Sequence, residues 1–396
     1  MMNSYGVIHN DAEVVSKIVA SQAHHKKIDG HAPGLQGKDL DTYVAAGVYS
    51  DHECATMEDA LAKLQRGQFI MIREGTAARN LEALAPLLTP QYAERCMFCT
   101  DDKHPSDLLE KGHIDYIARE AINKYGVDPI IAVKAACHHA SRYFLLNNRG
   151  AIAPGYLADF AVIDNFKDFN VEMVFKKGIL YWNNGELRDF EAPKIEEYLD
   201  KRAHDTFHVS TLTPDDFRDT RQRGVLGMVP GEIITTDNGY ADHVDLEKDI
   251  LKIAVVERHK GTHHIGLGYI QGYGLKSGAV ATSISHDSHN IIVVGTNSAD
   301  MAFAANYIVE HHGGIVVVEN GTVKGDVVLE IAGIMSDRPL TEVNDQLEAA
   351  KDAAFTLGVS RGIDPFMTLS FMALPVIPKL RITTRGVIDV DTQQYV

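Results

Sequence analysis

One pattern constrains the fold of this chain more than any other: an apolar run, a polar cluster and a helix-like segment follow one another four times. The apolar runs cover residues 28–31, 48–50, 69–72 and 96–99. The segments between and after them space their apolar side chains as helices do, at residues 12–23, 40–46, 57–64, 77–88 and 105–124. This order predicts successive βα units built on a parallel sheet, and therefore an α/β fold.

The character of the sequence changes after Gly150. Short β-rich runs at 171–176 and 179–182 are joined by Lys177-Gly178, which predicts a small antiparallel unit. Residues 192–202 are charged and helical, as expected of a connector. Beyond them, β-rich runs alternate with helical segments at 301–311 and 343–357, which predicts a separate α+β domain. The predicted domains are 1–150, 151–190 and 205–396.

The polar clusters stand at the carboxyl ends of the predicted strands. They are Asp29-Gly30-His31, Asp51-His52-Glu53, Arg73-Glu74 and Asp101-Asp102. In a (β/α)8 barrel, catalytic residues collect at this edge of the strands. Four units would make half of such a barrel. The periodicity alone leaves a barrel fragment and a different α/β arrangement both open.

Three residues in these clusters have the chemistry of metal ligands. His31 and His52 end consecutive strands, and Asp101 ends a strand two units later. Imidazole and carboxylate groups suit zinc, iron or manganese, and ligands from separate strands leave room for water. The sequence therefore predicts one divalent metal held by His31, His52 and Asp101. The alternative is that each histidine is a loop residue with an ordinary hydrogen bond.

Charge and hydropathy exclude some classes of partner. The net charge of −16 argues against nucleic acid and anionic membranes, which require a basic surface. The sequence contains no apolar run of the roughly 18 residues that a membrane span needs. Four cysteines are too few for a disulfide framework in a chain of 396 residues. We therefore expect a cytoplasmic protein with a small-molecule partner.

The four polar clusters, with their flanking residues, resemble the corresponding motifs of adenine deaminases of the metal-dependent amidohydrolase superfamily. The resemblance also extends to residues 150–159, which are similar to the superfamily's return from barrel to β-sandwich. Residues 286–290, 293–297 and 364–371 are similar to the extra domain of adenine deaminases. The resemblance implies the C-terminal half of a (β/α)8 barrel, a small β-sandwich segment and a C-terminal α+β domain of the adenine deaminase type. The motifs that carry the barrel part are Asp29-Gly30-His31-Ala32-Pro33-Gly34, Ser50-Asp51-His52-Glu53-Cys54, Ile72-Arg73-Glu74-Gly75 and Cys99-Thr100-Asp101-Asp102-Lys103-His104-Pro105.

The resemblance implies hydrolysis of adenine to hypoxanthine and ammonia in purine salvage, with a metal-activated hydroxide attacking the carbon that bears the amine. His31 and His52 match ligands on the fifth and sixth barrel strands, and Asp101 matches an aspartate on the eighth that binds metal and takes the proton. Glu53 is a second catalytic candidate. We also expect a homo-oligomer. Candidates for contact with the purine are Arg73, Glu74 and Asp102.

The chain departs from the family's pattern at its start. Family members carry a His-x-His pair after the first barrel strand and a bridging acidic residue or modified lysine after the fourth. Met1-Met2-Asn3 resembles the segment that follows the bridging residue, so we expect an N-terminally truncated chain that deaminates adenine far more slowly than a complete enzyme. A non-catalytic remnant and another amidohydrolase, such as a deacetylase or cyclic amidase, are the alternatives. For residues 286–289, which include His286, Asp287 and His289, the sequence allows two interpretations: a further metal site or a polar turn.

Overall fold

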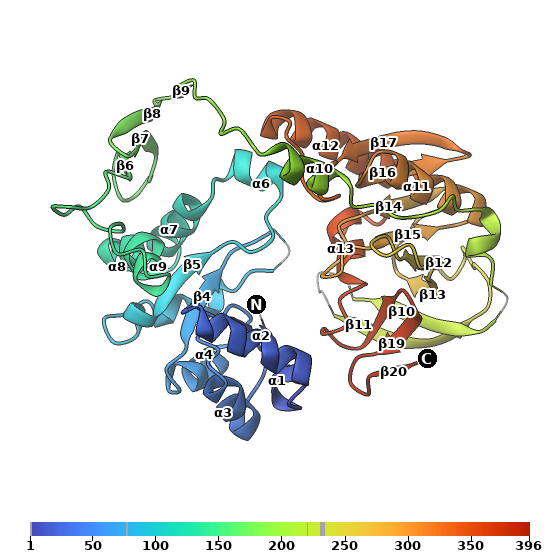
Figure 1. Ribbon diagram of the computed structural model, residues 1–396, viewed down its shortest axis with the longest axis horizontal. Coiled ribbons are helices and arrows are strands. Elements are labelled where there is room, and N and C mark those ends of the chain that lie inside the picture. Colours follow the sequence, from blue (N-terminus) through green and yellow to red (C-terminus); the bar gives the residue numbers. More distant parts are fainter. Residues whose placement is uncertain (1, 77, 220, 230–233) are drawn as a thin grey trace. The chain divides into compact units, whose positions relative to one another are not determined.

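The computed structural model describes residues 2–76, 78–219, 221–229 and 234–396, and the chain forms two compact units, Met1–Ala192 and Pro193–Val396 (Figure 1). A parallel sheet organises the first unit, with its strands in the order in which they occur along the chain. Among the described residues this sheet is open, with β1 and β5 as its edges. Its strands are β1 (Met2–Asn3), β2 (Asp29–His31), β3 (Ser50–Asp51), β4 (Phe69–Arg73) and β5 (Cys96–Cys99).

Helices separate the strands of this sheet, as the alternating pattern predicts. Two of them begin at capping side chains: Asp11 accepts hydrogen bonds from the backbone at the start of α2, and Thr56 does so at the start of α4. The predicted helices at 12–23 and 57–64 are confirmed in full. The helices are α1 (Ser4–Ile8), α2 (Ala12–Ala23), α3 (Gly37–Ala45), α4 (Met57–Leu64), α5 (Leu81–Leu84), α6 (Pro105–Glu110), α7 (Ile114–Asn123), α8 (Pro129–Val133) and α9 (His139–Tyr143).

Two predicted helices are shorter in the structure. The segment predicted as one helix over 105–124 is α6 and α7, separated at Gly112, whose φ of +105° lies outside the helical region. The segment predicted over 77–88 contains only α5 and the 3₁₀ turn Ala85–Leu87. Pro86 has no N–H for an α-helical hydrogen bond, which accounts for the early end. Ala77, the predicted first residue, lies outside the described residues.

Side chains of β4 and β5 form much of the hydrophobic core of the first unit. Ile70 and Ile72 of β4 and Phe98 of β5 are buried against Ile117 of α7. At β2 the chain approaches its neighbour so closely that a Cβ on Gly30 would lie 2.1 Å from the Ser50 carbonyl oxygen. Glycine is therefore required there, and the close approach brings the ends of β2 and β3 together.

Residues 160–187 form a separate antiparallel sheet of four strands in the first unit. The strands pair in chain order, and the tight turn at Lys177-Gly178 joins β7 to β8 as predicted. The arrangement of this sheet as part of a β-sandwich stays a prediction. Its strands are β6 (Phe160–Ile163), β7 (Val171–Lys176), β8 (Ile179–Asn183) and β9 (Glu186–Leu187).

The second unit is built on an eight-stranded sheet covered on both faces. Alternate residues of β12 (Ile250–Val256) enter different cores: Ile253 packs in the core that contains residues of α12 (Leu340–Thr356), and Ala254 in the one that contains residues of α11 (Ser298–Glu310). The strand order is β11-β10-β13-β12-β15-β14-β16-β17. The remaining strands of this sheet are β10 (Arg223–Met228), β11 (Thr235–Ala241), β13 (Ile265–Gln271), β14 (Ala279–Thr282), β15 (Ile291–Gly295), β16 (Gly314–Glu319) and β17 (Thr322–Val328).

Smaller elements complete the second unit. A three-stranded antiparallel sheet lies near the C-terminus, and Ile382 and Val387 from it pack into the same core as α12. Among the described residues, no helix is long and apolar enough to cross a membrane. The elements are α10 (Glu197–His204), α13 (Pro365–Phe371), β18 (Leu380–Thr383), β19 (Gly386–Asp389) and β20 (Gln394–Tyr395).

Limited trypsin digestion is expected to cut first between the two units. Residues 188–196 form no helix or strand and are exposed, and Arg188, Lys194 and Lys201 are exposed cleavage sites. The segment offers few contacts to resist local opening, so cleavage there is favoured. Mass spectrometry should find a resistant C-terminal fragment that begins between residues 189 and about 211. Even degradation through residues 211–396 would contradict an independently folded second unit.

Candidate metal centre

His31 and His52 reach the carboxyl edge of the parallel sheet from neighbouring strands. His31 is the last residue of β2, and its backbone N–H donates to the hydroxyl of Tyr43 on α3 at 2.9 Å. Tyr43 is fully buried, so the helix holds the end of the strand in place. His52 and Glu53 follow β3 directly. The ends of β2 and β3 therefore place two imidazoles and a carboxylate at the same edge of the parallel sheet.

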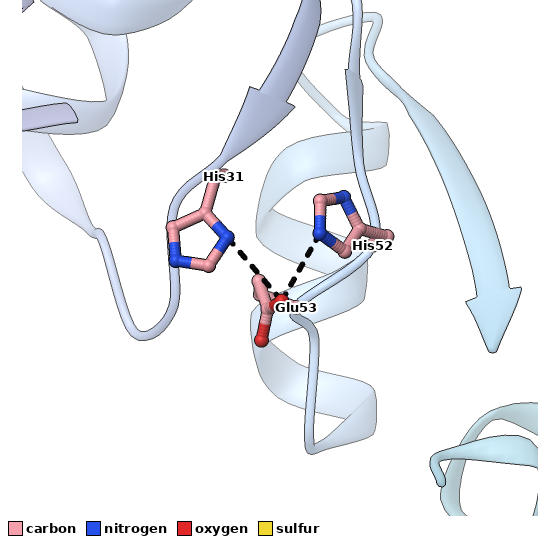
Figure 2. Close-up of side chains that lie close together, drawn as sticks. All are labelled: His31, His52 and Glu53. Carbon is pink, nitrogen blue, oxygen red and sulfur yellow. Dashed lines mark ion pairs between the residues drawn. The ribbon is translucent and has the colours of Figure 1, made fainter. Parts of the chain in front are cut away.

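Figure 2 shows His31 and His52 on either side of Glu53. The Oε1 atom of Glu53 lies 3.3 Å from Nδ1 of His31 and 3.1 Å from Nε2 of His52. The two imidazole rings are 5.5 Å apart, centroid to centroid. One potential ligand atom from each of the three residues lies within 4.8 Å of the other two. We call these three residues the His31–His52–Glu53 cluster.

Arg73 links this cluster to Asp101. At the end of β4, its Nη1 lies 2.6 Å from Oε1 of Glu53 and its Nη2 donates to Oε2 at 3.1 Å. The same Nη1 donates to Oδ2 of Asp101 at 2.8 Å. Asp101 follows β5 with a φ of +53°, and its side chain is 41% exposed. The guanidinium therefore holds both carboxylates, one buried and one open to solvent.

The loops that carry Arg73 and Asp101 are packed tightly together. A Cβ on Gly75 would lie 2.6 Å from the carbonyl oxygen of Thr100 and 2.7 Å from that of Asp102. The backbone N–H of Glu74 donates to the Cys99 carbonyl, and that of Thr76 to the Asp102 carbonyl. Glycine at position 75 permits this approach, which keeps Asp101 within reach of Arg73.

Charge interactions favour an ionised Glu53 at neutral pH. Burial by itself raises the pKa of Glu53, but the contacts with His31 and His52 and the Arg73 guanidinium outweigh it and hold the pKa well below its usual range. For His52, burial lowers the pKa, and the Glu53 carboxylate more than compensates, so the net shift is upward. Glu53 therefore supplies an ionised carboxylate next to both imidazoles.

The cluster fits a divalent metal. His31 is 8% exposed, and neither of its ring nitrogens makes a hydrogen bond to the described residues; the 3.3 Å contact with Glu53 has the distance of an ion pair but not the alignment of a hydrogen bond. Buried polar atoms without a hydrogen bond are costly unless something else occupies them. Two imidazoles with a carboxylate are a common ligand set for zinc, iron and manganese. Asp101, the third ligand predicted from the sequence, is not in this metal-sized group of described residues; it contacts Arg73, which also contacts Glu53.

Glu74 and Asp102 are the other two predicted substrate contacts. The Oε1 atom of Glu74 is 3.9 Å from Nε of Arg79, and burial raises the pKa of Glu74. The backbone carbonyl of Asp102 accepts a hydrogen bond from the N–H of Thr76. Arg73 is therefore connected to the cluster by its ion pair with Glu53, whereas Glu74 lies near Arg79. A purine contact for either residue stays a prediction.

One buried lysine near the cluster is not among the site residues predicted from the sequence. Lys63 of α4 is fully buried and lies 3.0 Å from Oδ2 of Asp51 and 2.9 Å from Oδ2 of Asp59. The i,i+4 spacing of Asp59 and Lys63 is visible in the sequence. The same spacing describes an ordinary solvent-exposed ion pair, so it could not reveal burial.

The His286 region of the second unit is a polar turn beside an aromatic ring. The His286 ring stacks on Phe371 with centroids 4.8 Å apart, and the His289 ring lies 5.8 Å from it. In the parts of the chain that the structure describes, no third ligand atom joins them in a metal-sized group. The turn gives no support to a further metal.

Comparisons with known proteins cover both units. Residues 1–180 match the amidohydrolase family model, and residues 232–394 match the model of the adenine deaminase C-terminal domain. An adenine deaminase of Desulfatibacillum aliphaticivorans is 44% identical, over 100% of this chain and 70% of the relative. One of Nitratidesulfovibrio vulgaris (strain DP4) is 43% identical with the same coverage. Among solved structures, a β-aspartyl dipeptidase of Fervidobacterium islandicum AW-1 aligns at 17% identity with a TM-score of 0.36, covering 46% of this chain and 55% of that one.

Proposed function

Because the chain belongs to the adenine deaminase family of amidohydrolases, we propose that it hydrolyses adenine to hypoxanthine and ammonia at the His31–His52–Glu53 cluster, with Arg73 and Asp101 beside it. Identity of 44% along the whole chain supports the reaction. The observation that carries the location is the convergence of one buried imidazole, one half-buried imidazole and a carboxylate on one edge of the parallel sheet. That edge is where α/β proteins of this kind place their chemistry.

The residues present favour a divalent cation as the cofactor. His31 and His52 would hold it, with Asp101 or Glu53 as the carboxylate ligand. Manganese, iron and zinc all suit this set. Such a cation lowers the pKa of water and so makes hydroxide available near neutral pH, where adenine would otherwise resist hydrolysis.

The chain's own carboxylates and guanidinium would do the rest. Arg73 contacts Oδ2 of Asp101, which leaves Oδ1 on an exposed side chain to accept a proton from water and return it to the leaving amine. Glu53 is held ionised by its neighbours, and it orients both imidazoles. Arg73, Glu74 and Asp102 are the proposed contacts for the purine ring.

Several broader features belong to the same proposal. The parallel sheet supports the C-terminal half of a (β/α)8 barrel over 1–150, with a β-sandwich segment at 151–190 and the adenine-deaminase-type domain at 205–396. The net charge of −16 supports a small-molecule partner in place of nucleic acid. The four cysteines are free, which suits a reducing cytoplasm and a role in purine salvage. A homo-oligomer completes the proposal.

A substrate panel tests the reaction. With Mn²⁺ added, adenine is expected to be converted to hypoxanthine in preference to a cyclic amide or an N-acetyl amino sugar, because the family resemblance includes the domain specific to adenine deaminases. Absorbance and ammonia release follow the deamination of adenine, acetate release follows deacetylation, and chromatography of the ring-opened acid follows hydrolysis of the cyclic amide. Faster ring opening or deacetylation would favour another amidohydrolase, and no turnover of any substrate would favour a non-catalytic remnant.

A further inference from the structure

The buried ammonium of Lys63 lies at the centre of a second cluster of side chains. Its Nζ donates to Oδ2 of Asp51 at 3.0 Å, to Oδ2 of Asp59 at 2.9 Å and to the carbonyl oxygen of Ala32 at 2.7 Å. These three acceptors match the three N–H bonds of an ammonium. We call Lys63, Asp51 and Asp59 the Lys63 network. All three are less than a tenth exposed.

Asp51 links the two segments that follow the candidate imidazole ligands. Its Oδ1 accepts a hydrogen bond from the backbone N–H of Ala32 at 2.9 Å, and its Oδ2 accepts one from the N–H of Glu53 at 3.0 Å. Ala32 follows His31 in the chain, and Glu53 follows His52. One carboxylate therefore bonds the residue after each histidine, while Lys63 holds the carbonyl of Ala32.

The network is not itself a second metal site. Asp51, Cys54 and Asp59 have ligand atoms within 4.8 Å of one another, which is a metal-sized group. The Lys63 ammonium already lies against all three, including the Cys54 sulfur at 3.6 Å. Like charges in one place repel, and a buried cation needs anionic partners of its own. The network thus supplies its own cation.

Stability alone gives little reason for such a network. Buried ion pairs can often be exchanged for apolar side chains without loss of stability, because the desolvation cost offsets the attraction. Here, however, the donors and acceptors include backbone atoms of both ligand-bearing loops, which apolar side chains could not bond. That connection is the feature that an apolar replacement would lose.

We propose that Asp51 and Lys63 are positioning residues, which fix the loops after β2 and β3 so that His31 and His52 face a common ion. The inference rests on the proposed metal centre, and it assigns no contact with the substrate to either residue. Partners that orient metal ligands typically contribute 10- to 100-fold to metal affinity.

Two matched substitutions separate positioning from general stability. Asn has the shape of Asp but only one acceptor oxygen, so Asp51→Asn cannot bond the N–H groups of both Ala32 and Glu53. Asp59→Asn removes an equivalent buried charge from the same ammonium, and Asp59 has no hydrogen bond to Ala32 or Glu53. Both variants of the full chain are compared with wild type by urea unfolding, by Mn²⁺ binding and by hydrogen exchange without metal.

We expect Asp51→Asn to bind Mn²⁺ about 10- to 100-fold more weakly than wild type. We also expect the amides of Ala32 and Glu53 to exchange faster in this variant, while Asp59→Asn keeps both properties near wild type. Equal effects in the two variants, in proportion to their stability, would overturn the proposal. If wild type bound no Mn²⁺, the proposed function would fail, and hydrogen exchange would still decide whether Asp51 holds the two loops.

A second pair of variants serves if Asp51→Asn does not fold. Lys63→Gln can still donate to the Ala32 carbonyl, whereas Lys63→Met cannot. The glutamine variant is expected to protect the Ala32 region from exchange better and to bind Mn²⁺ more tightly. The reverse order, or identical behaviour, would count against a positioning role for Lys63.

Discussion

Replacing Asp101 by asparagine is expected to slow adenine deamination by about 10²- to 10⁴-fold, the range that a positioned acid–base group contributes. Asn retains the size of the side chain and an oxygen that can accept from Arg73, as Oδ2 of Asp101 does at 2.8 Å. It cannot take up and release a proton near neutral pH. The loss should therefore appear in kcat, with the protein still folded. Hypoxanthine formation with Mn²⁺ present gives the measurement.

Glu94→Gln is the matched control for this experiment. Glu94 is an exposed carboxylate in the turn before β5, whereas Asp101 follows the same strand at its other end. The control should retain the wild-type rate. An Asp101→Asn variant as active as the control would remove Asp101 from the mechanism.

Replacing either His31 or His52 by alanine is expected to weaken Mn²⁺ binding by more than the 10- to 100-fold that is typical of residues that only orient a ligand. Each substitution removes an imidazole nitrogen that lies within 4.8 Å of the other candidate ligand atoms. Water can fill the space but supplies a weaker donor that is not held in place. Electron paramagnetic resonance of free Mn²⁺ measures the affinity directly.

His24→Ala provides the control, because His24 is exposed at the end of α2 and belongs to neither metal-sized group of the described residues. Its affinity for Mn²⁺ should equal that of wild type. Unchanged affinity in both the His31→Ala and the His52→Ala variants would show that the ion binds elsewhere. Thermal unfolding of each variant verifies that the comparison is made between folded proteins.

The sequence is informative about the parallel sheet because strand ends and polar clusters coincide. The predicted strand over 96–99 matches β5, and the predicted strand over 69–72 lies within β4. Short apolar runs bounded by polar residues are a local signal, so they can be recognised without knowledge of the packing. Helix ends depend on single residues such as Gly112 and Pro86, and the spacing of apolar residues does not reveal their effect.

The contacts within the site could not be predicted from the sequence because they depend on side-chain direction and burial. Nothing in the spacing of Glu53, Arg73 and Asp101 indicates that one guanidinium contacts both carboxylates. A charged lysine in a helix usually faces solvent, yet Lys63 is fully buried. Both features follow from tertiary packing, which brings residues 20 or more positions apart into contact.

Anomalous X-ray diffraction from crystals of the chain grown with Mn²⁺ tests the central claim most directly. Data collected at the manganese absorption edge locate the ion without reference to activity. The account predicts a peak between the imidazoles of His31 and His52, beside the carboxylate of Glu53. A peak confined to other parts of the molecule, or none at a saturating Mn²⁺ concentration, would contradict it.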